Sequence, residues 1–232
     1  MNYHKTAILL LLGCFSILSN SFSQETDFKP YIGFGVHGGV NFADANFDEG
    51  GPNSGKSFQA AQQYSGGVFI NFMAEPHAGV QIELNRSNRG WVEEDTGYTY
   101  TRKASYLEIP VLTHLNFGKQ LMRYNINLGP YIAFHRGFEE TIDLKVPGYE
   151  VPVNDSVNSY YGKDPDYTFD FGFMIDASVG VNTSIGIFSL RARYSYGMVD
   201  MFEEYPDGIF RYSLMRNLYV GAVYTYNINL KK

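Results

Sequence analysis

Apolar and polar residues alternate along most of this chain, with a period of two. From Ile32 to Phe42, one set of alternate positions is apolar and the other carries glycine, histidine and asparagine. Successive side chains of a β-strand point to opposite faces, so this alternation predicts a strand with one apolar face. The pattern returns seven more times, and it predicts eight strands at residues 32–42, 66–74, 77–85, 106–117, 123–135, 167–182, 188–198 and 218–230. Helical periodicity appears nowhere with comparable strength, so we predict an all-β fold.

The connections between the predicted strands alternate between long and short. Along the chain they are residues 45–61 (long), 75–76 (short), 90–98 (medium), 118–120 (short), 138–165 (long), 183–186 (short) and 200–212 (long). An up-and-down barrel with all its long loops at one end produces this order. Outer-membrane barrels have short periplasmic turns and longer external loops. With eight strands, both termini fall on the short-turn side. We therefore expect the N- and C-termini to be periplasmic.

Two kinds of closed barrel share this period. A soluble lipocalin-like carrier has its apolar face inside, whereas a membrane barrel turns that face toward lipid. Here the apolar face is nearly free of charge in mid-strand and carries tyrosine and phenylalanine toward strand ends, which is typical of interfacial aromatic girdles. The other face is rich in glycine, serine and asparagine, which fit the crowded lumen of an eight-stranded barrel. We predict an eight-stranded antiparallel up-and-down transmembrane β-barrel in contact with outer-membrane lipid.

The first residues have the layout of a secretory signal peptide. Lys5 precedes an apolar run from Ala7 to Leu18, and Ser21 and Ser23 flank a small-x-small cleavage site. We expect cleavage after Ser23, which divides the chain into a signal peptide (residues 1–23) and a barrel domain (residues 24–232). The segment LLGC, ending at Cys14, also resembles a lipoprotein lipobox, but the apolar run continues beyond this cysteine.

Composition narrows the possible chemistry. Without Lys5, 17 basic residues stand against 24 acidic ones, a formal charge of −7 that argues against nucleic-acid binding. The only cysteine, Cys14, is lost with the predicted signal peptide, and the histidines show no ligand spacing, so we predict no metal and no cofactor.

The stretch GFGVHG matches the dinucleotide fingerprint, but no helical pattern follows it. We interpret its glycines as residues that leave room for bulkier groups in the lumen.

Charged residues on the polar face are expected to pair inside the barrel. If the tight turn at residues 183–186 sets the register, Arg193 lies opposite Asp176 and Arg191 lies beside Ser178. A buried charge needs a partner. We therefore predict a structural polar network that fills the lumen, formed by Glu83, Glu108, Asp170, Asp176, Arg191 and Arg193. The four histidines of the barrel domain are interpreted as polar filling of the same lumen (His37, His77, His114 and His135).

One strand carries a more specific motif. Ser105 to Leu112 reads SYLEIPVL, with a glutamate on the lumen face and a proline within the strand. This sequence resembles the YLEIP strand of the PorT-like outer-membrane β-barrel family of Bacteroidota. The glycine-rich first strand followed by Asn41-Phe42, and Gly129-Pro130-Tyr131, resemble that family too. The resemblance implies an outer-membrane barrel, and it implies no particular activity.

Three functions remain open from the sequence. The first is a non-enzymatic, monomeric outer-membrane barrel, inserted by the outer-membrane assembly machinery, whose loops 45–61, 138–165 and 200–212 contact protein or ligand outside the cell. An open porin is disfavoured because water-filled pores need about 16 strands. The second is an outer-membrane enzyme acting at the loop rim, for which His37 and His135 are candidates without an evident nucleophile. The third is a secreted lipocalin-like carrier.

Overall fold

The computed structural model describes residues 28–49, 57–118, 121–151, 161–202 and 210–230. The expected signal peptide, residues 1–23, lies outside the described residues. The described part contains eight strands: β1 (Tyr31–Glu49), β2 (Ser57–Met73), β3 (Ala78–Glu94), β4 (Tyr98–Phe117), β5 (Met122–Leu144), β6 (Phe169–Thr183), β7 (Gly186–Gly197) and β8 (Phe210–Asn229).

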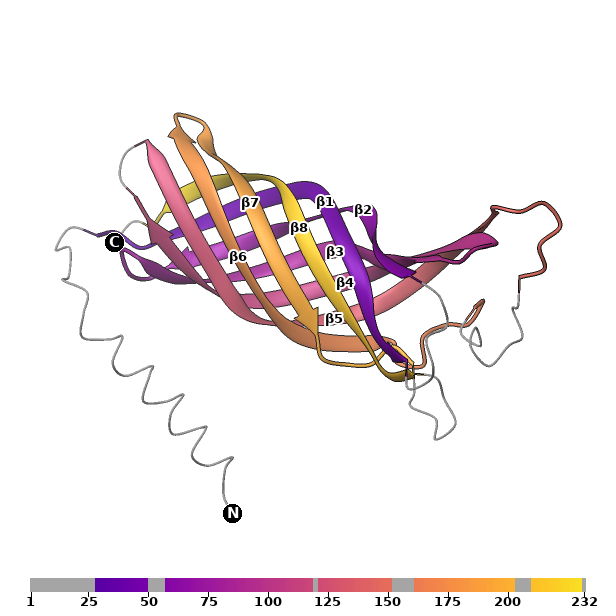
Figure 1. The fold of residues 1–232 in the computed structure, drawn as a ribbon. Coiled ribbons are helices and arrows are strands. Elements are labelled where there is room, and N and C mark those ends of the chain that lie inside the picture. The colour runs from indigo at the N-terminus through magenta and orange to yellow at the C-terminus, as the bar shows by residue number, and fades with distance from the viewer. Residues whose placement is uncertain (1–27, 50–56, 119–120, 152–160, 203–209, 231–232) are drawn as a thin grey trace, which may run out of the picture.

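The strands form one closed barrel in sequence order (Figure 1). Every neighbouring pair is antiparallel, and β8 closes the ring on β1, with Tyr31 opposite Asn229 and Phe42 opposite Leu218. The predicted eight-stranded up-and-down barrel is confirmed. No helix in the described part of the chain is both long and apolar enough to cross a membrane.

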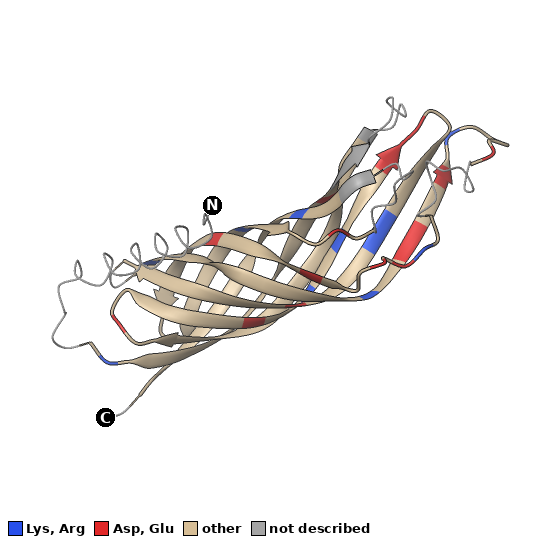
Figure 2. Cartoon of the chain, turned by 90° about the horizontal axis from the view of Figure 1, so that it is seen from below, with Lys and Arg blue, Asp and Glu red and all other residues tan. Residues whose placement is uncertain are grey.

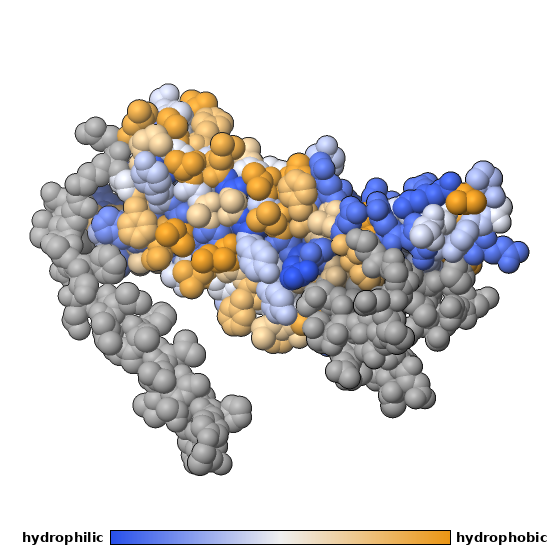
Figure 3. All heavy atoms as spheres, viewed as in Figure 1, coloured by the Kyte–Doolittle hydropathy of each residue, from blue (hydrophilic) through white to orange (hydrophobic). Residues whose placement is uncertain are grey.

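The apolar face of the barrel points outward. Alternate side chains such as Val36, Ile82 and Leu190 are 51%, 52% and 66% exposed, while the polar residues between them are buried in the lumen. In Figure 3, hydrophobic side chains accordingly cover much of the visible barrel wall, and hydrophilic ones gather toward one end. This orientation is the one that lipid contact requires, and it is the reverse of a lipocalin-like carrier.

Several strands are longer than the sequence pattern predicted. The medium loop expected at residues 90–98 is wrong: β3 continues to Glu94 and β4 begins at Tyr98, joined by a three-residue turn. Residues 45–49 belong to β1, 57–61 to β2, 138–144 to β5 and 210–212 to β8, so the three long loops are shorter than expected. Their remaining parts at 50–56, 152–160 and 203–209 lie outside the described residues.

The alternation continues in these extensions, but with its polarity reversed. On β4, the outward residues Thr99, Thr101 and Lys103 are polar, whereas the inward Tyr98 and Tyr100 are buried and aromatic. We call residues 86–94 of β3, 98–105 of β4 and 137–144 of β5 the extended sheet. It projects from the end of the barrel that carries the long connections, where charged residues also concentrate (Figures 1 and 2).

The opposite end of the barrel is closed by short turns. The turn after β6 is held by Thr183, whose Oγ1 donates to the Gly186 carbonyl at 2.7 Å. The turn after β4 contains Gly118, with a φ of 101° that favours glycine. The two ends of the barrel domain meet here, because the Leu230 amide donates to the Pro30 carbonyl at 3.0 Å.

Candidate functional site

Near the short turns, the lumen is filled by a layer of amide, hydroxyl and imidazole groups. His114 Nδ1 lies 2.6 Å from Asn127 Oδ1, and Asn127 Nδ2 donates to Asp176 Oδ1 at 2.6 Å. Asn125 accepts from the Asn116 amide at 2.8 Å and donates to Ser178 Oγ at 3.0 Å. Each hydrogen bond joins neighbouring strands, so these side chains stabilise the strand pairing from the lumen side as well as filling the lumen.

The next layer is a cluster of two arginines and two carboxylates. Arg193 Nη2 lies 2.7 Å from Glu83 Oε1 and 2.6 Å from Asp176 Oδ2. Arg191 Nη1 lies 3.2 Å from Glu83 Oε1. All four side chains are at most 6% exposed, and their formal charges cancel. Buried charges are tolerated when they are paired and hydrogen-bonded in this way.

A third layer is centred on Arg89, which is buried. Its Nη2 lies 2.5 Å from Glu108 Oε2 and its Nη1 lies 2.6 Å from Asp170 Oδ2. The guanidinium also lies over the rings of Tyr106 and Tyr131, 4.7 and 5.2 Å from their centroids. Cation–π contact of this kind adds to the stabilisation of a desolvated arginine.

Asn85 joins the two charged layers. Its Nδ2 donates to Glu83 Oε2 at 2.9 Å and lies 3.4 Å from Glu108 Oε1. The structure thus places all six residues of the predicted network in the lumen, in two ion-pair clusters that Asn85 connects. The register places Arg193 opposite Asp176 and Arg191 opposite Ser178. Arg89 was missed because the pattern of the expected strand ended at Asn85.

Little free volume remains between these layers. One cavity of about 20 Å³ lies among the amide residues, and another of about 20 Å³ lies beside His37 and Arg193. A cavity needs roughly 10–15 Å³ to hold one water molecule. Each of these two gaps therefore holds a single water at most.

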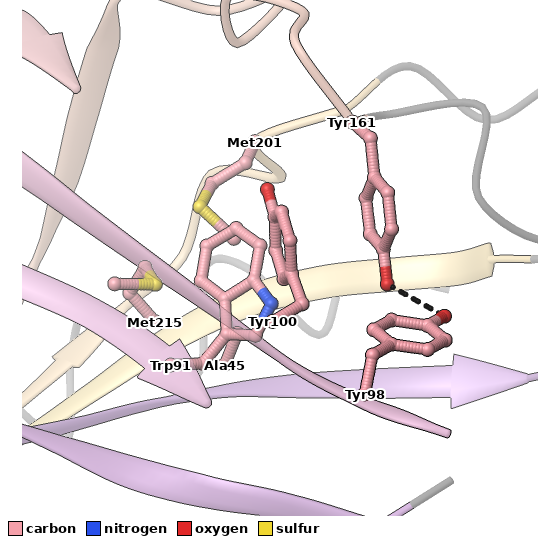
Figure 4. Close-up of a cluster of buried hydrophobic side chains, with 7 residues drawn as sticks. All are labelled: Ala45, Trp91, Tyr98, Tyr100, Tyr161, Met201 and Met215. Atoms are coloured by element: carbon pink, nitrogen blue, oxygen red, sulfur yellow. Dashed lines mark hydrogen bonds between the residues drawn. The ribbon is translucent and has the colours of Figure 1, made fainter. Parts of the chain in front are cut away.

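An aromatic cap closes the lumen at the end with the extended sheet (Figure 4). Tyr161, from the β5–β6 connection, stacks on Tyr100 of β4 with ring centroids 3.9 Å apart. Its hydroxyl lies 3.2 Å from that of Tyr98 and donates to Glu93 Oε2 at 2.8 Å. Trp91 belongs to the same cluster and is fully buried. We define the aromatic cap by its buried members, Ala45, Trp91, Tyr98, Tyr100, Tyr161, Met201 and Met215.

Arg102 connects the cap to the extended sheet. Its Nη1 donates to Glu140 Oε1 at 2.9 Å and its Nη2 donates to the Lys163 carbonyl at 2.6 Å. Its guanidinium lies 3.9 Å from the centroid of Phe138. Burial, followed by the nearby Glu93 carboxylate, raises the pKa of Tyr161, so its phenol stays protonated and continues to donate. Tyr161 and Met201, from the described parts of two connections, therefore pack over the lumen, which the sequence did not predict.

The histidines occupy several layers. His37 lies 3.0 Å from Tyr219 Oη and 2.9 Å from Asn85 Oδ1, and His135 packs against Tyr106. The prediction that all four fill the lumen is wrong for His77, which lies in the β2–β3 turn and stacks on Phe117, an outward-facing residue. Within the described ranges, no three histidine, cysteine or acidic residues are grouped so as to hold a metal ion.

Comparison with known proteins identifies the family. A family model described as "Outer membrane protein beta-barrel domain" matches residues 22–203. This chain belongs to that family. It is an outer-membrane β-barrel protein of the small-barrel type, and the family places it in the outer membrane of a Gram-negative bacterium.

Solved outer-membrane barrels resemble it at low sequence identity. Ail of Yersinia pestis is 11% identical with a TM-score of 0.40, and the match covers 84% of this chain and 98% of Ail. Neisserial surface protein A is 10% identical with a TM-score of 0.39, over 83% of this chain and 97% of that one. No curated protein matches the chain.

The edge of the lipid-facing surface is well marked on this outer-membrane barrel. On β1 and β8, Asp44 and Arg216 lie next to the outermost of the outward-facing apolar residues, Phe42 and Leu218. The two charged residues pair across the strands, with Arg216 Nε 2.9 Å from Asp44 Oδ1. On β3, β4 and β5, the first outward charged residues are Arg86, Lys103 and Arg136. Charged side chains are disfavoured in hydrocarbon, so this ring marks where the bilayer core ends.

Proposed function

We propose that this protein is a closed, non-catalytic outer-membrane barrel that holds the extended sheet and its connections outside the cell as a contact surface. The observation that carries the proposal is the extended sheet with its aromatic cap. About 9–11 residues per strand are enough to cross a bilayer. β4 has 20 residues and β5 has 23, so both continue well beyond that need.

The filled lumen supports the closed state. The amide layer, the two charged layers and the aromatic cap follow one another from the short turns outward, and two gaps among them have volumes of about 20 Å³ each. A transport role would need a path through all of these layers. The described residues are instead arranged to stabilise the barrel and to support what lies above it.

The remaining parts of the proposal follow from the same architecture. Long connections of outer-membrane barrels face outward and short turns face the periplasm, which gives periplasmic termini and external connections between β1 and β2, between β5 and β6, and between β7 and β8. We further propose a monomer, exported by an N-terminal signal peptide and inserted by the outer-membrane assembly machinery. The YLEIP strand supports a PorT-like relationship, with Glu108 of that motif paired to Arg89.

Cysteine labelling in intact cells tests the orientation. Glu150 is exposed in the β5–β6 connection, and Ile185 is exposed in the short turn between β6 and β7. A membrane-impermeant maleimide is expected to label Glu150→Cys in whole cells and to label Ile185→Cys only after lysis. Labelling of Ile185→Cys in intact cells, with Glu150→Cys protected, would contradict the proposed orientation.

Photo-crosslinking in living cells tests the contact surface. A photoreactive amino acid at Thr101, which faces outward on the extended sheet, is expected to give a discrete adduct. The same amino acid at Ile185 serves as the control at the other end of the barrel. The contact role is wrong if several outward positions of the extended sheet yield no adduct beyond that control.

A further inference from the structure

A polar groove lies on the outer wall of the barrel, at the border between the apolar belt and the extended sheet. It has a volume of about 580 Å³ and is formed by β2, β3, β4 and β5. The residues that matter for its chemistry are Arg86, Lys103, Ser105, Arg136 and Glu139. These five side chains point away from the barrel axis, and the inward-facing Tyr106, which lies against Arg89, forms part of the floor of the groove.

Two irregularities in strand pairing produce the groove. Between β2 and β3 the register shifts between Ala60 and Gly66, and between β4 and β5 it shifts between Ser105 and Tyr106. The second shift leaves Arg136 as an extra residue that is exposed on the outer surface. Bulges of this kind bend a strand and re-aim a side chain.

The cations of the groove are not neutralised by ion pairs within the part of the chain that the structure describes. Arg86 Nε lies 3.3 Å from Ser105 Oγ, and no ion pair forms at Arg86, Lys103 or Arg136 among the described residues. Glu139 lies opposite Lys103 in the register and is the one acidic residue that lines the groove. Three cations against one carboxylate leave a local charge of +2 on a chain whose net charge is −6. Arg89, Arg191 and Arg193 in the lumen, in contrast, each contact a carboxylate.

The position of the groove indicates which anion it takes. Leu84, Leu107 and Phe134 lie on the same three strands, on the membrane side of the cations, and face outward. A lipid whose acyl chains lie along this apolar wall brings its headgroup to the height of Arg86, Lys103 and Arg136. Arginine forks bind phosphate oxygens in pairs, and lysine adds a point charge.

We propose that this groove binds the phosphate of a phosphorylated lipid in the leaflet that surrounds the extended end. Given the orientation proposed above, this is the external leaflet. The occupant is a lipid and not a free anion, because the cations lie directly above a wall that already contacts acyl chains. Binding there fixes the height of the barrel in the membrane and holds the extended sheet at a set distance from the lipid surface.

The test compares two triple variants of equal charge. Arg86→Gln, Lys103→Gln and Arg136→Gln together remove the groove cations. Lys29→Gln, Lys145→Gln and Lys163→Gln together remove three exposed cations elsewhere. Each protein is placed in phosphatidylcholine nanodiscs, and binding of phosphorylated lipid A is measured against the same lipid after enzymatic dephosphorylation.

The wild type and the control variant are expected to bind the phosphorylated form about tenfold more tightly, since one charge-assisted contact is worth about a factor of ten. The groove variant is expected to lose this preference. A preference retained by the groove variant overturns the proposal, and so does inorganic phosphate binding as tightly as the lipid. Heat-modifiable gel mobility verifies folding, and the single variant Lys103→Gln replaces the triple variant if that one does not fold. The cysteine labelling described above reports orientation separately, so the two proposals fail by different results.

Discussion

At the scale of single residues, the lumen depends on glycines as much as on charges. Gly35 lies on the inner face of β1, where a Cβ would overlap the ring of Phe69 on β2. That ring in turn lies 5.4 Å from the guanidinium carbon of Arg191, which contacts Glu83. Gly38, three residues away in the GFGVHG stretch, points outward, and a Cβ there would meet nothing within 4 Å. The glycines of this stretch therefore have different roles although they form one motif.

This difference gives a prediction with a built-in control. Gly35→Ala is expected to lower the free energy of unfolding by about 1–3 kcal/mol, the usual cost of overpacking a core, because Phe69 must move against Arg191. Gly38→Ala is expected to change it by less than about 0.5 kcal/mol. Guanidinium unfolding from lipid vesicles, followed by heat-modifiable mobility, measures both. Equal effects of the two substitutions would show that the Gly35–Phe69–Arg191 contact does not matter for stability.

At the scale of elements, the extended sheet packs against described residues of two connections, because Tyr161 and Met201 share the aromatic cap with Trp91, Tyr98 and Tyr100. Trp91 is the only tryptophan of the chain, and it lies fully buried in the same cluster as Tyr161 and Tyr100. Its Nε1 donates to Glu93 Oε1 at 2.8 Å, and Tyr161 donates to the other oxygen of the same carboxylate. The fluorescence of Trp91 therefore reports the aromatic cap without contribution from another tryptophan.

Removal of one ring is expected to loosen the aromatic cap and leave the barrel intact. Tyr161→Ala deletes the stacked ring and one donor to Glu93, a change that costs about 3–5 kcal/mol in a packed core. The emission of Trp91 should shift to the red and become accessible to acrylamide, while heat-modifiable mobility stays unchanged. Tyr64→Ala is the matched control, because Tyr64 is 76% exposed. Unchanged Trp91 emission in Tyr161→Ala would mean that the connection does not cover the lumen.

The extended sheet also shows which parts of the structure the sequence could predict. The regular alternation of apolar and polar residues predicts the barrel and its inward and outward faces. The tight hairpin at residues 183–186 predicts the pairing of Arg193 with Asp176. In the extended sheet, which begins at Arg86, side chains still alternate between inward and outward positions, but most outward residues are polar. A search for strands with an apolar outward face therefore ends at Arg86. Arg89, Trp91 and Arg102 were missed for this reason. The folding of Tyr161 over the lumen depends on contacts between distant segments, which no local pattern contains.

At the scale of the whole molecule, the lumen is blocked more than once. The layer of Glu83, Asp176, Arg191 and Arg193 is neutral, and the layer of Arg89, Glu108 and Asp170 lies between it and the aromatic cap. Replacement of a complete ion-pair cluster leaves no uncompensated buried charge, so it costs less stability than removal of one partner. Each layer can therefore be emptied separately without an unpaired arginine being left in the lumen.

Planar-bilayer recordings test whether the layers block the lumen independently. The wild type is expected to give no conductance steps. The variant with Glu83, Asp176, Arg191 and Arg193 all changed to alanine should also give none, because the Arg89 layer still closes the lumen. The variant with Arg89, Glu108 and Asp170 changed to alanine should stay closed for the reciprocal reason. The variant that combines all seven substitutions should give no steps either, because the amide layer and the aromatic cap still close the lumen. Large, stable steps from the wild type would contradict the closed lumen itself. Steps from either single-layer variant would show that the remaining layer is not a barrier, and heat-modifiable mobility of each protein separates these outcomes from misfolding.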